Sequence, residues 1–160
     1  MRSVEISRSR GSGPGGQHRN RVETRVTLLH LPTGISGTAG ERRTVRENRP
    51  VAVRRLRLEL AVRVRSGVPL GEIGSVVWRA RRGQGKQSGR IVVSEAHWDY
   101  PALLAEALDV IVAGGLDVRR ASLRLEVSQS QLVKLVGRHA PAMAALNTAR
   151  KHHGMGAFRT

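Results

Sequence analysis

The sequence contains no cysteine and only four aromatic residues, which are Trp78, Trp98, Tyr100 and Phe158. Without cysteine the chain can form no disulfide, no thiolate nucleophile and no cysteine-ligated zinc site. So few aromatic rings argue against recognition of single-stranded bases mainly by stacking. No apolar run approaches the roughly 20 residues of a membrane span, and the first residues lack the apolar region of a signal peptide. We therefore expect a cytoplasmic protein with no membrane partner.

Acidic residues are also scarce, since 28 Lys and Arg face 12 Asp and Glu, a formal net charge of +16. All but three of the basic residues are arginines, whose planar fork grips phosphate at two points. A codon bias toward arginine is the plain alternative cause. Residues 1–65 carry 15 arginines against five acidic residues, a net +10. The composition therefore predicts a polyanionic partner that faces the N-terminal part of the chain.

The pattern of the first part predicts a small β-hairpin domain with one packed helix. Alternating residues near Val4 and a run over residues 26–31 indicate strands, with a turn over 32–34 and a weak, edge-like strand over 35–39. Thr44 and Glu47 fit a capping box that opens a helix, and Gly67 is expected to end it. Pro50 would cost this helix one hydrogen bond unless the helix begins near it.

The rest of the chain is expected to be a linker followed by helices. Residues 79–90 hold five basic residues, three glycines and no acid, which favours a mobile basic linker over residues 67–98. Caps at Asp99, Asp117 and Ser128, and Pro141 as a helix start, predict about four helices over residues 99–160. The expected fold class is α+β, with domains at 1–66 and 99–160 joined by this linker.

Residues 11–17 are all loop formers and include the triplet Gly15, Gly16 and Gln17. The triplet alone is also typical of a flexible glycine-rich turn. Its flanks change the interpretation, because residues 10–21 (RGSGPGGQHRNR) resemble the signature of class I peptide chain release factors. The match continues at residues 23–24, 29–35, 43–44 and 48–49 and covers roughly residues 3–64. Two departures are Arg21 in place of a usual lysine and Val45 in place of a common glutamine.

The resemblance implies a reaction and its catalytic residues. In that family the loop enters the ribosomal peptidyl-transferase centre and promotes attack of water on the ester that joins the nascent peptide to P-site tRNA. Gly15, Gly16 and Gln17 are then the catalytic set. Paired glycines let the main chain approach RNA closely, and the neutral Gln17 can position water without acting as a base. His18 could be interpreted as a general base, but its place in the family pattern argues against that role.

The resemblance also implies which residues bind RNA. The expected partners are large-subunit ribosomal RNA and peptidyl-tRNA, and no cofactor or metal is expected. The adjacent His152 and His153 are interpreted as surface histidines. For any single arginine, a plain solvated surface is the alternative. The expected RNA-binding residues are Arg10, Arg19, Arg21, Arg25, Arg43, Arg49, Arg81, Arg82 and Lys86.

The second half decides which kind of release factor is expected. Residues 66–160 resemble no domain that reads a stop codon, so the chain is similar to the short, codon-independent ribosome-rescue type. The basic stretch 79–90 could probe the empty mRNA channel or could be a plain solvated linker. Residues 120–136 resemble a helix-turn-helix with Glu126 at the usual turn glycine. Its face (Gln129, Ser130, Gln131, Lys134) could touch a groove, or the region could serve only for packing or ribosome docking. The alternative function is a nucleic-acid-binding regulator with a vestigial loop.

Overall fold

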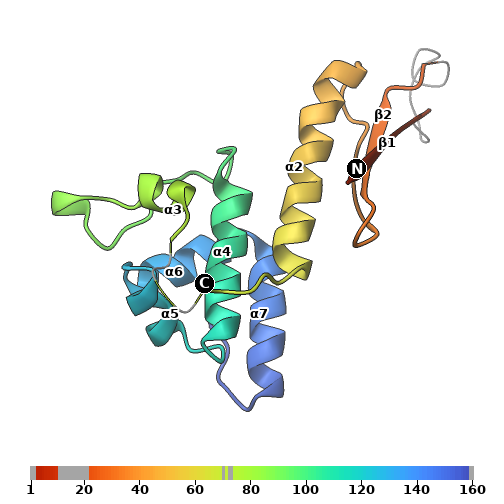
Figure 1. Cartoon of the computed structure of the whole chain (residues 1–160). Coiled ribbons are helices and arrows are strands. Elements are labelled where there is room, and N and C mark those ends of the chain that lie inside the picture. Colours follow the sequence, from red (N-terminus) through yellow and green to blue (C-terminus); the bar gives the residue numbers. More distant parts are fainter. Residues whose placement is uncertain (1–2, 11–21, 70, 72–73, 159–160) are drawn as a thin grey trace. The chain divides into compact units, whose positions relative to one another are not determined.

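The computed structural model describes residues 3–10, 22–69, 71 and 74–158 (Figure 1). The chain forms two compact units, Met1–Leu60 and Ala61–Thr160. The first unit combines a sheet with a helix, and the second is helical. The predicted α+β class is therefore confirmed. Among the described residues, no helix combines the length and the apolar composition that crossing a membrane requires.

The sheet of the first unit has three antiparallel strands in the order β1 (Val4–Ser9), β2 (Arg25–His30) and β3 (Ile35–Ala39). The two edge strands flank β2, so β3 lies at an edge as its composition predicted. In β2, Val26 and Leu28 alternate toward the core and are nearly fully buried. The last pair between β1 and β2 joins Ser9 and Arg25.

The long helix α2 (Val45–Arg63) starts where the capping box predicted. The Thr44 hydroxyl accepts from the Glu47 backbone N–H at 3.2 Å and donates to the Glu47 carboxylate at 2.7 Å. Pro50 lies inside the helix rather than at its start. It is exposed, so water can solvate the carbonyl that its missing N–H leaves without a helical partner.

Gly37 explains why β3 contains poor strand formers. A Cβ at this position would lie 2.3 Å from the backbone nitrogen of Leu56 and 2.6 Å from the carbonyl oxygen of Ala52. Only a residue without a side chain lets the strand and α2 approach this closely. The glycine therefore weakens the strand locally but is required for the helix to pack on the sheet.

The second unit contains the short α3 (Val76–Arg81) and η1 (Gly85–Gln87), then α4 (Tyr100–Ala113), α5 (Val118–Arg124), α6 (Gln129–Gly137) and α7 (Ala140–His152). The four helices expected after residue 99 are present. Side chains from α4 and α6, among them Leu103, Leu104, Ile111 and Leu132, are fully buried and form its core. Burial of such apolar surface is the main stabilising contribution to a unit of this size.

The middle segment is more structured than its composition indicated. Trp78 of α3 is 1% exposed and donates its indole N–H to the carbonyl oxygen of Leu125 at 3.0 Å. Ile91 and Val93 are also buried. These apolar anchors outweigh the glycine-rich, basic composition between them, because one buried tryptophan removes a large apolar area from water. The predicted domain limits at 66 and 98 stay a prediction.

Candidate functional site

The two ends of the residue 10–24 loop are attached to neighbouring strands. The loop leaves β1 after Ser9 and returns to β2 at Arg25, directly opposite. Residues 11–21 lie outside the described residues, so the predicted catalytic Gly15, Gly16 and Gln17, and with them Arg19 and Arg21, have no described geometry. What the structure describes is the base on which this loop is mounted.

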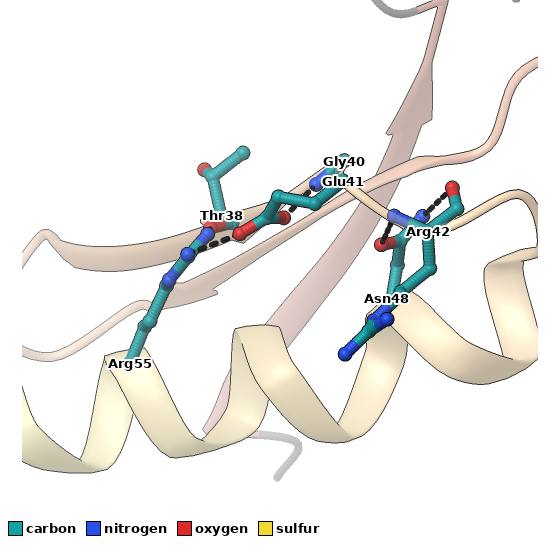
Figure 2. Close-up of polar contacts among 6 residues, drawn as sticks. All are labelled: Thr38, Gly40, Glu41, Arg42, Asn48 and Arg55. Carbon is teal, nitrogen blue, oxygen red and sulfur yellow. Dashed lines mark hydrogen bonds and ion pairs between the residues drawn. The ribbon is translucent and has the colours of Figure 1, made fainter.

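A buried asparagine holds the returning end of the loop. The Asn48 side chain is fully buried and donates to the carbonyl oxygen of Thr24 at 2.7 Å and to that of Arg42 at 3.0 Å. It also accepts from the Arg42 backbone N–H at 2.9 Å, as Figure 2 shows. One side chain of α2 therefore fixes both the loop end before β2 and the segment that leads into the helix. Both the oxygen and the nitrogen of this amide form hydrogen bonds with backbone groups, as a buried polar side chain requires.

A second connection joins α2 to the end of β3 (Figure 2). Arg55 donates to the carbonyl oxygen of Thr38 at 2.7 Å and forms an ion pair with Glu41, whose carboxylate also accepts from the Gly40 N–H at 2.7 Å. The hydrogen bond from Arg55, followed by that from Gly40, lowers the pKa of Glu41. Both charged side chains are about half exposed, so the pair adds little stability.

The arginines expected to bind RNA in the first unit differ in their surroundings. The side chains of Arg10, Arg43 and Arg49 are exposed and form no hydrogen bond or ion pair with another described residue. Arg25 is half-buried and lies against Gly40, where an added Cβ would come within 3.3 Å of its side chain. Three of these guanidinium groups are thus available to a phosphate, and the fourth is packed beside the base of the loop.

The three residues expected to bind RNA in the second unit differ in whether their side chains form an internal ion pair. Arg81 forms an ion pair with Asp99 at 2.8 Å, and Arg82 forms one with Glu126. Lys86 is exposed and has no hydrogen bond or ion pair within the described part of the chain. The structure therefore gives Arg81 and Arg82 internal partners, and their contact with RNA stays a prediction.

Asn48 and Gly37 are the positions whose roles the sequence analysis missed. A signal for Asn48 was present, because Asn48, Ala52 and Leu56 recur every four residues and form the buried stripe of α2. A polar residue in such a stripe needs buried partners, which only the fold supplies. Within the described ranges, no group of three or more His, Asp or Glu is placed to hold a metal.

A sheet that mounts a Gly-Gly-Gln loop between two strand ends, with an arginine-rich helix packed on it, defines a release-factor-like domain. Residues 1–68 match the family model of the RF-1 domain. Residues 1–68 therefore carry an RF-1 domain, which the chain shares with peptide chain release factors.

Several curated relatives are similar to this chain. Peptide chain release factor 1 of Xylella fastidiosa is 30% identical over 142 residues, which cover 82% of this chain and 38% of that protein. Peptide chain release factor 1 of Acidiphilium cryptum is 38% identical over 88 residues, 55% of this chain and 24% of that protein. Peptide chain release factor 2 of Thermomicrobium roseum is 43% identical over 65 residues, 39% of this chain and 17% of that protein. The chain thus spans well under half the length of these relatives, while the first of these matches extends beyond the RF-1 domain.

Proposed function

We propose that this protein hydrolyses the ester bond of peptidyl-tRNA on the ribosome and does so without reading a codon, as a ribosome-rescue factor. The observation that carries the proposal is the Gly-Gly-Gln loop of an RF-1 domain, mounted between β1 and β2 with its returning end held by Asn48. Holding this end of the loop in place favours catalysis. Orienting the reacting groups costs entropy, and part of this cost is met before the ribosome is bound.

The chemistry assigned to the loop needs no ionisable side chain. Gly15 and Gly16 allow the main chain to approach the ester, and the Gln17 backbone N–H is a donor for the developing oxyanion. The Gln17 amide orients the attacking water, as a neutral group with both donors and an acceptor. Loss of an oxyanion donor typically costs a factor of about 10²–10³ in rate, so this small loop can carry a large part of the activity.

Binding is assigned to the exposed arginines around the loop. Arg10, Arg43 and Arg49 come from the start of the loop, the segment before α2 and α2 itself, and all three are exposed. Together with Arg19 and Arg21 they offer positive charge to the phosphates of large-subunit RNA and P-site tRNA. Such contacts position the protein without reading sequence.

Codon-independent action is proposed because residues 66–160 resemble no domain that reads a stop codon. In the described residues that region forms helices, among them α5 and α6, which a short turn joins. The test compares stalled ribosomes with an empty A site and ribosomes with a stop codon in the A site. Release of equal extent from both supports codon independence, and release only with a stop codon contradicts it.

The activity is tested with labelled peptidyl-tRNA on those ribosomes. Release by the wild-type chain should fall about 100-fold in Gln17→Ala, which removes the amide that orients water but keeps the backbone N–H. A similar loss is expected in Gly16→Ala, which restricts the main chain that presents this N–H. Gly67→Ala is the matched control, because a Cβ at Gly67 meets nothing within 4 Å. Absence of release from every stalled complex, or equal loss in Gly67→Ala, would overturn the assignment.

A second candidate function rests on α5 and α6, which form a helix-turn-helix with the turn residue Glu126 at φ 53°. This geometry favours a nucleic-acid-binding regulator in which the Gly-Gly-Gln loop has no catalytic role. Tight, sequence-specific binding of duplex DNA, combined with no peptide release, would favour this candidate over the first.

A further inference from the structure

Residues 82–91 fold back on themselves beside the helix-turn-helix. Arg82 and Ile91 form an antiparallel bridge, and the Gly83 N–H donates to the Arg90 carbonyl oxygen at 2.9 Å. The tip turns through η1, with Gly85 and Gly89 at φ 56° and 77°. Figure 1 shows this segment between α3 and α4, in light green. We call residues 82–91 the basic hairpin.

Three contacts fix the basic hairpin and the preceding α3 to the turn of the helix-turn-helix. The buried Trp78 donates to the Leu125 carbonyl oxygen at 3.0 Å. Arg82 forms an ion pair with Glu126. The Ser128 N–H donates to the Gly89 carbonyl oxygen at 2.8 Å, next to the start of α6. These contacts reach Leu125, Glu126 and Ser128, which all lie between α5 and the start of α6. The basic hairpin and α6 therefore keep a defined relative position.

A groove of ≈ 890 Å³ lies between residues 81–97 and α6, and its lining combines the apolar Ile91, Val92 and Val93 with polar side chains. Gln87 and Arg90 line it from the hairpin, Gln131 lines it from α6, and Arg138 follows that helix. Glu95 also lines the groove and is the one acidic residue among its described lining. Gln129, Ser130 and Lys134 of α6 line a second pocket, which shares Arg138 with this groove, so the basic hairpin and α6 present adjoining surfaces.

The cations on this surface fall into two groups. Arg82 and Arg138 are engaged internally, with Glu126 and with the carbonyl oxygen of Val93. The side chains of Lys86, Arg90 and Lys134 are exposed and form no hydrogen bond or ion pair with the residues that the structure describes. The engaged arginines hold the surface together, and the other three cations are available to a ligand.

We propose that the basic hairpin and the exposed side of α6 form a docking surface for the backbone of an RNA double helix. The free cations of this surface would contact phosphates. Its other polar groups are amides and hydroxyls that both donate and accept, as a ribose 2′-hydroxyl does. They are Gln84, Gln87, Ser88, Gln129 and Ser130.

The choice of RNA over DNA follows from the recognition chemistry and rests on the proposed function on the ribosome. Recognition helices that read DNA place several base-reading side chains in the wide major groove. The major groove of an RNA helix is too deep and narrow for this, so proteins read its shape, phosphates and 2′-hydroxyls instead. Of the side chains on the exposed side of α6, Lys134 alone carries a positive charge. The amides and hydroxyls of the surface can bond the 2′-hydroxyls that DNA lacks, while its three cations contact phosphates.

The test measures binding of a labelled RNA hairpin of about 16 base pairs to the full chain over a range of salt concentrations. Because the first unit is itself rich in arginine, the comparison is between two variants with the same loss of charge. One is Lys86→Ala/Arg90→Ala, and the control is Arg119→Ala/Arg120→Ala on the exposed side of α5. Loss of two phosphate contacts should weaken binding about five- to tenfold and lower the salt slope by roughly 1.4 to 1.8, with little change in the control.

Three further measurements decide the proposal. Charge-conserving Lys86→Arg/Arg90→Lys should keep the wild-type affinity and slope, which separates lost contacts from misfolding. Native hydrogen exchange should show RNA-dependent protection over residues 83–90 and 128–134. Equal effects of the two alanine pairs, absence of this protection, or tighter binding of a DNA duplex of the same sequence would overturn the proposal. The same measurements in a Gln17→Ala background do not depend on peptide release, so failure here is distinguishable from failure of the proposed function.

Discussion

Replacement of Asn48 by alanine should destabilise the first unit and release the end of the Gly-Gly-Gln loop. The change removes three hydrogen bonds from a fully buried amide. The hydrogen bond to the carbonyl oxygen of Thr24 is buried. Leaving this oxygen without a partner lowers the free energy of unfolding by about 1–3 kcal/mol. The two bonds to Arg42 are only partly buried, so water can replace them and each contributes about 0.5–1 kcal/mol. The expected total is about 2–5 kcal/mol.

The assay must report on the first unit by itself. Both tryptophans and the single tyrosine lie in the second unit, so intrinsic fluorescence does not report on the sheet or on most of α2. Native-state hydrogen exchange of peptides from β2 and α2 does report there. A loss of about 2–5 kcal/mol corresponds to exchange that is roughly 30- to 4,000-fold faster in those peptides. Peptides from α4 serve as the internal reference.

Two comparison variants make the result decisive. Arg46→Ala changes an exposed residue half a turn earlier on α2 and should alter stability by no more than about 0.5 kcal/mol. Asn48→Asp keeps the volume and the acceptor for Arg42 but places a carboxylate against two carbonyl oxygens, so it should be at least as destabilising as alanine near neutral pH. If Asn48→Ala accelerates exchange no more than Arg46→Ala does, Asn48 does not hold the base of the loop.

Two other expectations concern stability in each unit. Gly37→Ala should destabilise the first unit by about 3 kcal/mol or more, because the added Cβ would meet backbone atoms of Ala52 and Leu56 that cannot move aside. Gly67→Ala should be close to neutral in the same hydrogen-exchange experiment, because its added Cβ meets nothing within 4 Å. In the second unit, burial raises the pKa of Asp109 above 3.8, so the folded chain binds this proton more readily than the unfolded chain does. The free energy of unfolding of the wild type, compared with that of Asp109→Asn, should therefore rise as the pH falls through the raised pKa toward 3.8. Urea titrations followed by tryptophan fluorescence measure this difference, and a difference that does not change with pH would contradict the prediction.

Local patterns in the sequence were sufficient for the elements of the fold. The capping box at Thr44, the strand alternation of residues 26–31 and the side-chain caps of α5 and α6 each depend on residues within one or two turns of each other. Two such expectations were wrong, because Asp99 forms no capping hydrogen bond at α4 and α2 ends at Arg63, before Gly67. Such signals persist because the hydrogen bonds they predict are local. The middle segment was harder, since its glycines and basic residues are typical of a linker. Its order depends on Trp78, whose hydrogen-bond partner Leu125 lies 47 positions away.

The sequence by itself determined the release-factor-like domain, the α+β class and the motif that carries the proposed chemistry, because a motif and its spacing are properties of the chain order. Only the tertiary structure decided how that loop is mounted and which cations are available. Asn48 is polar yet fully buried because two backbone segments distant in sequence meet at its side chain. Arg82 and Lys86 look equivalent in the sequence, but Arg82 lies beside Glu126 and Lys86 does not form such a pair. Partners of this kind are set by packing between distant segments, which composition and periodicity do not encode.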